Sequence, residues 1–131
     1  MSPLAKATYG ILRLRLALAD PRITYAELAE QLRDADEQFE SVYHRSRELY
    51  RALGEVGKVC RKLGLPPLPA LVVRADSGRP GAAYYSERFA GVIYKGERVA
   101  AWQRDLEAVK RTRYPASAGK IRPVTFPKPT R

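Results

Sequence analysis

Apolar residues recur at helical spacing near the start of the chain. The residues that follow one another in steps of three and four are Leu4, Ala7, Ile11, Leu14 and Leu18. This spacing places them on one face of an α-helix. Asp20-Pro21 is predicted to end the helix, because proline disfavours the helical conformation of the residue before it.

A second helix is predicted to begin at Thr24, where the sequence forms a capping box. The Thr24 hydroxyl accepts a hydrogen bond from the amide of Glu27, and the Glu27 carboxylate accepts one from the amide of Thr24. Ile23, just before the cap, is expected to pack against the helix as a hydrophobic staple. The apolar positions that follow extend a short amphipathic helix to about Arg33.

The strongest helical periodicity lies in the segment 45–63. Its apolar positions are Leu49, Leu53, Val56, Cys60 and Leu63. Gly64 suits the left-handed conformation after a last helical turn, and Pro66-Pro67 prevents continuation. The acidic segment 34–40 is predicted to form a loop and the first turn of this third helix, where negative charge complements the helix dipole. The polar positions of the helix are basic: Arg45, Arg47, Arg51, Lys58, Arg61 and Lys62.

A β-hairpin and a closing helix are predicted after Pro67. Residues 68–74 form a short buried strand, and residues 82–85 return as its partner. The turn residues 76–81 join the two strands, which places Arg74 and Arg79 near the tip. The closing helix spans Val99 to Lys110 and presents one apolar face, made of Val99, Trp102, Leu106 and Val109.

This order of elements predicts an α+β fold with a winged helix-turn-helix-like helical core and a small β-hairpin wing. We expect this domain to occupy residues 1–110. Residues 111–131 contain four prolines and six basic residues but no acidic residue, so we expect a flexible basic tail. Its basic residues are Arg111, Arg113, Lys120, Arg122, Lys128 and Arg131.

Charge is distributed unevenly along the chain. The formal net charge is +10, and residues 1–40 hold 5 basic and 7 acidic side chains against 19 and 7 in residues 41–131. A surplus of this kind favours phosphate-rich partners and speeds their capture. We therefore expect the binding surface in the later two-thirds of the chain.

Hydropathy and cysteine usage indicate a cytoplasmic protein with no membrane partner. The longest apolar stretch, Ile11–Ala19, is interrupted by Arg13 and Arg15, and no run approaches the roughly 18 residues that a membrane-spanning helix needs. The N-terminus lacks the pattern of a secretory signal. One cysteine forms no internal disulfide, which fits a reducing compartment.

Several short segments between residues 23 and 110 occur in a recognisable order. They are Thr24-Tyr25-Ala26-Glu27-Leu28-Ala29, Arg51-Ala52-Leu53-Gly54, Leu71-Val72-Val73, Ser77-Gly78 with Gly81 and Tyr84, and Trp102. The set resembles the DNA-binding domain of O6-alkylguanine-DNA alkyltransferases and alkyltransferase-like proteins. The resemblance implies that Tyr25 and Arg51 press on the DNA backbone and fill the gap left by a flipped nucleotide. It also implies a recognition helix over residues 49–63 that works from the minor groove.

The reactive motif of that family is missing. Where the family has Pro-Cys-His-Arg, this chain has Leu68-Pro69-Ala70-Leu71, so the nucleophilic cysteine and its activating histidine are both replaced. Cys60 is expected on the apolar face of the basic helix as a buried, unreactive thiol. We therefore expect no alkyl transfer and no catalytic centre.

Other candidate chemistry is weaker. His44 has no histidine or cysteine partner, so we expect neither a metal nor another cofactor. The carboxylates of residues 34–40 fall in a predicted loop, whereas nuclease metal sites hold theirs on rigid elements, and a nuclease is therefore disfavoured. Three tyrosines, Tyr84, Tyr85 and Tyr94, either stack on bases or pair across the hairpin.

Together these features predict a non-catalytic nucleic-acid-binding protein, with duplex DNA favoured and RNA left open. The expected contacts come from Tyr25, Arg45, Arg47, Arg51, Lys58, Arg61, Lys62, Arg74 and Arg79. The tail is expected to capture nucleic acid by charge before the helix and the wing dock. The alternative is a protein-interaction or structural component of a larger nucleoprotein or virion assembly, with the tail contacting a protein partner.

Overall fold

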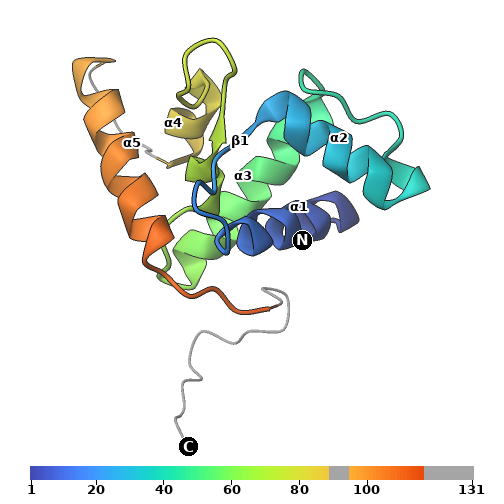
Figure 1. Cartoon of the computed structure of the whole chain (residues 1–131), viewed down its shortest axis with the longest axis horizontal. Coiled ribbons are helices and arrows are strands. Elements are labelled where there is room, and N and C mark those ends of the chain that lie inside the picture. The colour runs from blue at the N-terminus through green and yellow to red at the C-terminus, as the bar shows by residue number, and fades with distance from the viewer. Residues whose placement is uncertain (89–94, 117–131) are drawn as a thin grey trace, which may run out of the picture.

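The computed structural model describes residues 1–88 and 95–116, and Tyr94 and the tail from residue 117 onward lie outside the described residues. The elements, in chain order, are α1 (Pro3–Arg15), β1 (Ile23–Thr24), α2 (Tyr25–Ala35), the 3-10 turn η1 (Glu37–Phe39), α3 (Arg47–Lys62), the 3-10 turn η2 (Leu68–Leu71), β2 (Val72–Val73), α4 (Ala82–Arg88) and α5 (Lys95–Lys110) (Figure 1). The described chain is therefore mostly helical with one small sheet, as the α+β prediction requires.

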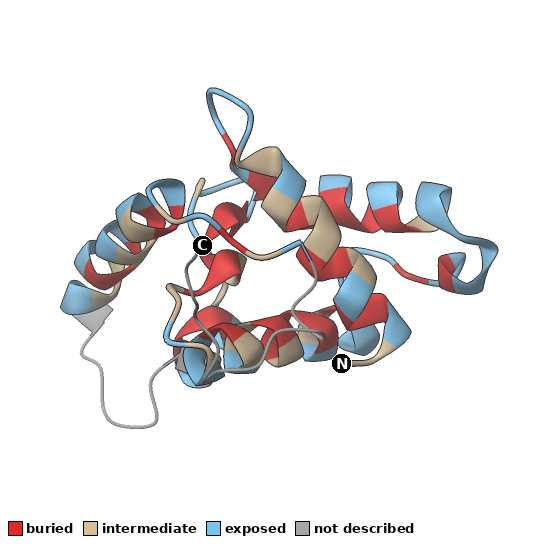
Figure 2. Cartoon of the chain, turned by 90° about the horizontal axis from the view of Figure 1, so that it is seen from below, coloured by how far each residue is buried: buried red, intermediate tan, exposed pale blue. Residues whose placement is uncertain are grey.

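Helix α3 lies at the centre of the molecule and contacts α1, η2 and α4. Its buried positions follow the predicted period, with Leu49, Val56 and Cys60 inside the core. Gly64, just beyond its C-cap, has φ +72°, the left-handed conformation expected there. Figure 2 shows the buried side of each helix turned toward the interior.

The two strands form a parallel pair in which Ile23 is opposite Val72 and Thr24 is opposite Val73. The predicted hairpin is wrong in two respects. Residues 68–71 form a 3-10 turn, and residues 82–85, the expected return strand, belong to α4. Positions 82 and 83 are both alanine, a strong helix former, which favours a helix there. Between β2 and α4, residues 74–79 make a tight loop in which the Arg74 amide donates to the Arg79 carbonyl (2.8 Å).

Helix α1 ends at Arg15 rather than at Asp20, and its apolar stripe is displaced from the predicted one. The side chains of Leu14 and Leu18 are 68% and 51% exposed, whereas Thr8 and Tyr9 are buried. Both polar groups are satisfied inside the core, because the Thr8 hydroxyl donates to the Leu4 carbonyl and the Tyr9 hydroxyl to the Pro115 carbonyl. A search for aliphatic residues at helical spacing does not find buried residues that carry a hydroxyl group, such as Thr8 and Tyr9.

The capping box at Thr24 is confirmed, with both of its hydrogen bonds present. Helix α2 continues to Ala35, and the acidic segment forms η1 rather than the first turn of α3. Because α3 begins at Arg47, Arg45 precedes the helix instead of lying on it.

The predicted closing helix is confirmed as α5, which begins four residues earlier than expected. Trp102, Leu106 and Val109 are buried along one side of it. The Trp102 indole N–H donates to the carbonyl of Ala70 (2.8 Å), which ties α5 to η2.

The segment directly after α5 packs against the body of the protein, although we expected the tail to begin at residue 111. Tyr114 is buried, and its hydroxyl donates to the Pro66 carbonyl (2.6 Å). The Arg13 Nε donates to the Tyr114 carbonyl (3.0 Å). Folded structure therefore extends past residue 110.

We expect Tyr114→Ala to lower the free energy of unfolding by about 3 kcal/mol, the usual cost of removing a buried aromatic ring. Tyr114→Phe should cost about 1 kcal/mol, because it removes the hydrogen bond to Pro66 and keeps the ring. Urea unfolding followed by circular dichroism measures both. Equal stability of all three proteins would contradict the anchoring role of Tyr114.

Candidate nucleic-acid interface

The solvent-facing side of α3 carries a stripe of cations. Arg47, Arg51, Lys58 and Lys62 are all exposed. At 3.6 residues per turn they fall within about 60° of one another around the helix axis. In the described part of the chain, none of the four has a carboxylate within 4 Å. We call these four residues the basic stripe.

A pocket of about 380 Å³ borders the basic stripe. Helix α3 contributes Tyr50, Gly57 and Arg61 to its lining, on the side adjacent to the stripe. The remaining walls come from the start of α2, the proline-rich turn after α3, α4 and α5. The volume lies within the range of small-molecule sites, about 300–1,000 Å³. The sequence-predicted contacts Tyr25 and Arg61 therefore meet at one cavity.

Tyrosine rings from three elements line the pocket. The ring centroids of Tyr25 and Tyr50 are 5.5 Å apart with their planes tilted by 38°. Tyr25 is fixed at its hydroxyl, which accepts a hydrogen bond from the Gly81 amide (3.0 Å). Tyr84 also lines the pocket, and it belongs to α4 rather than to a hairpin.

Two polar groups of the pocket are paired on its α4–α5 side. The Tyr84 hydroxyl donates to Asp105 Oδ2 (2.5 Å), which orients that carboxylate at the wall. Pro69, at the position where the resembling family carries its cysteine, gives the pocket an inert apolar surface. The arrangement offers stacking surfaces and a carboxylate acceptor, and its lining contains no cysteine.

An open cleft of about 770 Å³ adjoins the pocket and shares Tyr25 and Tyr50 with it. Arg45 and Arg74 both line this cleft, so the structure brings together two predicted contacts that are 29 positions apart. Arg74 forms an exposed ion pair with Asp76 (2.8 Å). Exposed pairs of this kind contribute little, about 0–1 kcal/mol, so a phosphate can compete for the guanidinium.

Arg79 is not part of this arrangement. It lines a separate surface with Trp102 and Gln103, on the α5 side of the 74–79 loop. Of the nine predicted contacts, the structure thus places eight on the basic stripe, the pocket or the cleft, and one elsewhere.

Sequence reasoning overlooked Tyr50 and Asp105. Tyr50 has a visible signal, because Tyr50, Gly57 and Arg61 share one side of α3 and glycine leaves space beside an aromatic ring. Asp105 has none, since nothing in the sequence connects it with the residues that it faces.

Cys60 is buried in the core, and burial raises the pKa of its thiol. Within residues 1–88 and 95–116, no group of three or more His, Cys, Asp or Glu side chains is placed to hold a metal ion. No helix among these residues is long and apolar enough to cross a membrane.

Comparisons with family models, curated proteins and solved structures returned no match to this chain.

Stability is expected to fall as the pH rises above about 9. Burial raises the pKa of Tyr9 to about 12 and raises the pKa of Tyr25, Cys60 and Tyr114 as well. The unfolded chain loses these protons near the ordinary values of 9.0 for cysteine and 10.0 for tyrosine, while the folded chain retains them. The unfolded state then binds fewer protons than the folded state, so the free energy of unfolding decreases with pH.

Urea midpoints measured at about pH 8, 10 and 11 test this dependence. Tyr114→Phe should make the decrease shallower, because phenylalanine has no proton to lose. A midpoint that is constant over this range would contradict the assignment.

Proposed function

We propose that this protein is a non-catalytic nucleic-acid-binding protein that docks on duplex DNA through α3. The observation that carries the proposal is the basic stripe, which lies on the exposed side of a helix whose opposite side is fixed in the core. Cations without carboxylate partners are suited to phosphate contacts, because binding releases the counterions of DNA. The stripe positions the protein on the backbone rather than selecting a sequence.

The docking mode is a variant of winged-helix binding. Helix α3 takes the place of the recognition helix, and the 74–79 loop takes the place of the wing. Arg45 and Arg74 flank the cleft between them and contact the phosphates on either side of the groove. Arg79 makes a peripheral contact at most, because it faces α5.

The pocket beside the stripe is proposed to receive a base that has left the duplex stack. Tyr25, Tyr50 and Tyr84 supply aromatic surfaces, and stacking on such surfaces contributes about 1–3 kcal/mol per base. The Asp105 carboxylate accepts hydrogen bonds from an exocyclic amine or a ring N–H. With Pro69 in place of a nucleophile, a captured base is bound and not modified.

Removing one cation from the basic stripe should weaken duplex binding about 5-fold and reduce the slope of log K against log salt by about 1. Arg51→Ala and Lys58→Ala test this in fluorescence-anisotropy titrations with a short duplex. Lys6→Ala is the matched control, because Lys6 is exposed on α1. Parallel titrations with single-stranded DNA and RNA identify the preferred nucleic acid. Salt-independent or absent binding would contradict the proposal and favour the alternative, a component of a protein assembly.

A duplex with an unpaired base should bind more tightly than its matched counterpart, and filling the pocket should remove the difference. A Cβ added at Gly57 would lie 3.8 Å from Pro69 Cγ, an ordinary contact, so Gly57→Leu occupies the pocket without a backbone clash. Gly57→Ala is the control, because it leaves most of the volume. Gly57→Leu should keep the affinity for the matched duplex. A preference for the unpaired base that survives Gly57→Leu would exclude the pocket.

A further inference from the structure

Another concave surface lies where the C-terminal ends of α1 and α5 meet. Its volume is about 400 Å³, and its lining includes four cations, Arg13, Lys110, Arg111 and Arg113. Lys110 forms an exposed ion pair with Glu107 (3.3 Å), a weak pair for which another carboxylate can compete. Cations in the last turn of a helix complement the helix dipole, which accounts for Arg13 and Lys110. Arg111 and Arg113 lie beyond the end of α5 and are exposed. We call this surface the basic groove.

Apolar side chains accompany these cations. Leu14 lines the groove, and Leu18 follows in the turn after α1, where its amide donates to the Arg15 carbonyl. Both leucine side chains are more than half exposed. A phosphate backbone offers little apolar surface to cover two leucines, whereas a protein surface with apolar and acidic side chains covers both the leucines and the cations.

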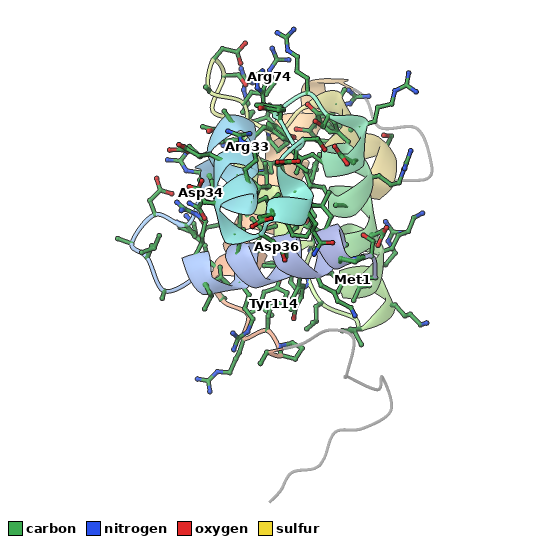
Figure 3. All side chains as sticks on the ribbon, turned by 90° about the vertical axis from the view of Figure 1, so that its right-hand side faces the viewer. Met1, Arg33, Asp34, Asp36, Arg74 and Tyr114 are labelled. Atoms are coloured by element: carbon green, nitrogen blue, oxygen red, sulfur yellow. The ribbon has the colours of Figure 1, made fainter. Side chains whose placement is uncertain are left out.

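A surface of that kind exists on the same molecule. Asp34, Asp36, Glu37 and Glu40 are exposed around η1. Tyr43, which is 55% exposed, lies against the Arg33 guanidinium, 4.4 Å from its ring centroid. Figure 3 shows Arg33, Asp34 and Asp36 on this side of the molecule. We call these four carboxylates and Tyr43 the acidic end.

The acidic end cannot fold back onto the groove of its own molecule. Figures 1 and 2 both place α5 at one end of the long axis and the end of α2 with η1 at the other. Both surfaces belong to packed elements, since Phe39 and Tyr114 anchor them in the core.

We propose that the basic groove of one molecule binds the acidic end of a second copy. Charge complementarity and exposed apolar side chains on both surfaces support this occupant. The contact is head-to-tail and leaves one free surface of each kind, so it can repeat. The net charge of +10 opposes association at long range. At an ionic strength of about 0.1 M that repulsion is screened beyond roughly 10 Å, while contacts within the interface persist.

Molecules joined by repeated head-to-tail contacts bind neighbouring positions on a long duplex cooperatively. This expectation rests on the proposed function. The basic groove and the basic stripe share no residue, so one molecule contacts DNA and its neighbour through different residues.

Sedimentation velocity of the full chain over a concentration series tests the contact. The sedimentation coefficient of the native protein should rise with concentration. The double variants Asp34→Lys/Glu37→Lys and Arg111→Glu/Arg113→Glu should each remain monomeric. An equimolar mixture of the two should associate again, because the intact groove of the first variant meets the intact acidic end of the second. Lys58→Glu/Lys62→Glu changes the charge by the same amount as the groove variant and should still associate.

Binding to DNA separates this proposal from the proposed function. On a duplex that holds one molecule the groove variant should bind more weakly than the native protein, because two cations of the basic tail are reversed. On a long duplex it should also lose cooperativity, which a loss of charge alone does not remove. Self-association without DNA binding would support the contact and contradict the proposed function. A protein that stays monomeric and binds long duplexes without cooperativity would overturn the contact, as would association that neither double variant reduces.

Discussion

The burial of one side of α3 is the constraint on which the rest of the structure depends. Leu49, Val56 and Cys60 are held in the core against α1 and η2, which fixes the rotation of the helix about its axis. The basic stripe is on the opposite side and must face water. The packing of α3 and the exposure of the basic stripe are thus consequences of one amphipathic pattern. A change that loosened the core would also disperse the cations.

The parallel pair of two-residue strands determines where two residues of the open cleft lie. Thr24 is opposite Val73, so the next residues along the chain, Tyr25 and Arg74, leave the sheet side by side. Both line the open cleft, and the Gly81 amide then fixes the Tyr25 hydroxyl. Such a short pair adds little stability by itself, and its strands are held by the burial of Ile23 and Val72.

The sequence predicts correctly those elements that depend on interactions between residues close together in the chain. The Thr24 capping box, the left-handed Gly64 and the apolar side of α5 each depend on residues within a few positions of one another. The pairing of β1 with β2 joins segments almost fifty residues apart, so the local pattern favoured a hairpin instead. The sequence pattern places Tyr114 in the tail, because its partner Pro66 is equally distant along the chain. The basic stripe was predictable from helical spacing, whereas the pocket was not, since its walls come from five segments.

The like charges of the basic stripe are not offset by ion pairs within the described chain. Ion pairs elsewhere in the described chain join close neighbours, such as Arg22 with Asp20 and Lys110 with Glu107. On α3, Arg47 and Arg51 are four residues apart, as are Lys58 and Lys62, and like charges at this spacing destabilise a helix by about 0.2–0.5 kcal/mol per pair. Glu55 lies between the two pairs, but its carboxylate accepts from the Ser2 amide (2.8 Å) and ties down the N-terminus. The fold therefore tolerates repulsion along this surface, and a phosphate backbone laid across it would relieve that repulsion.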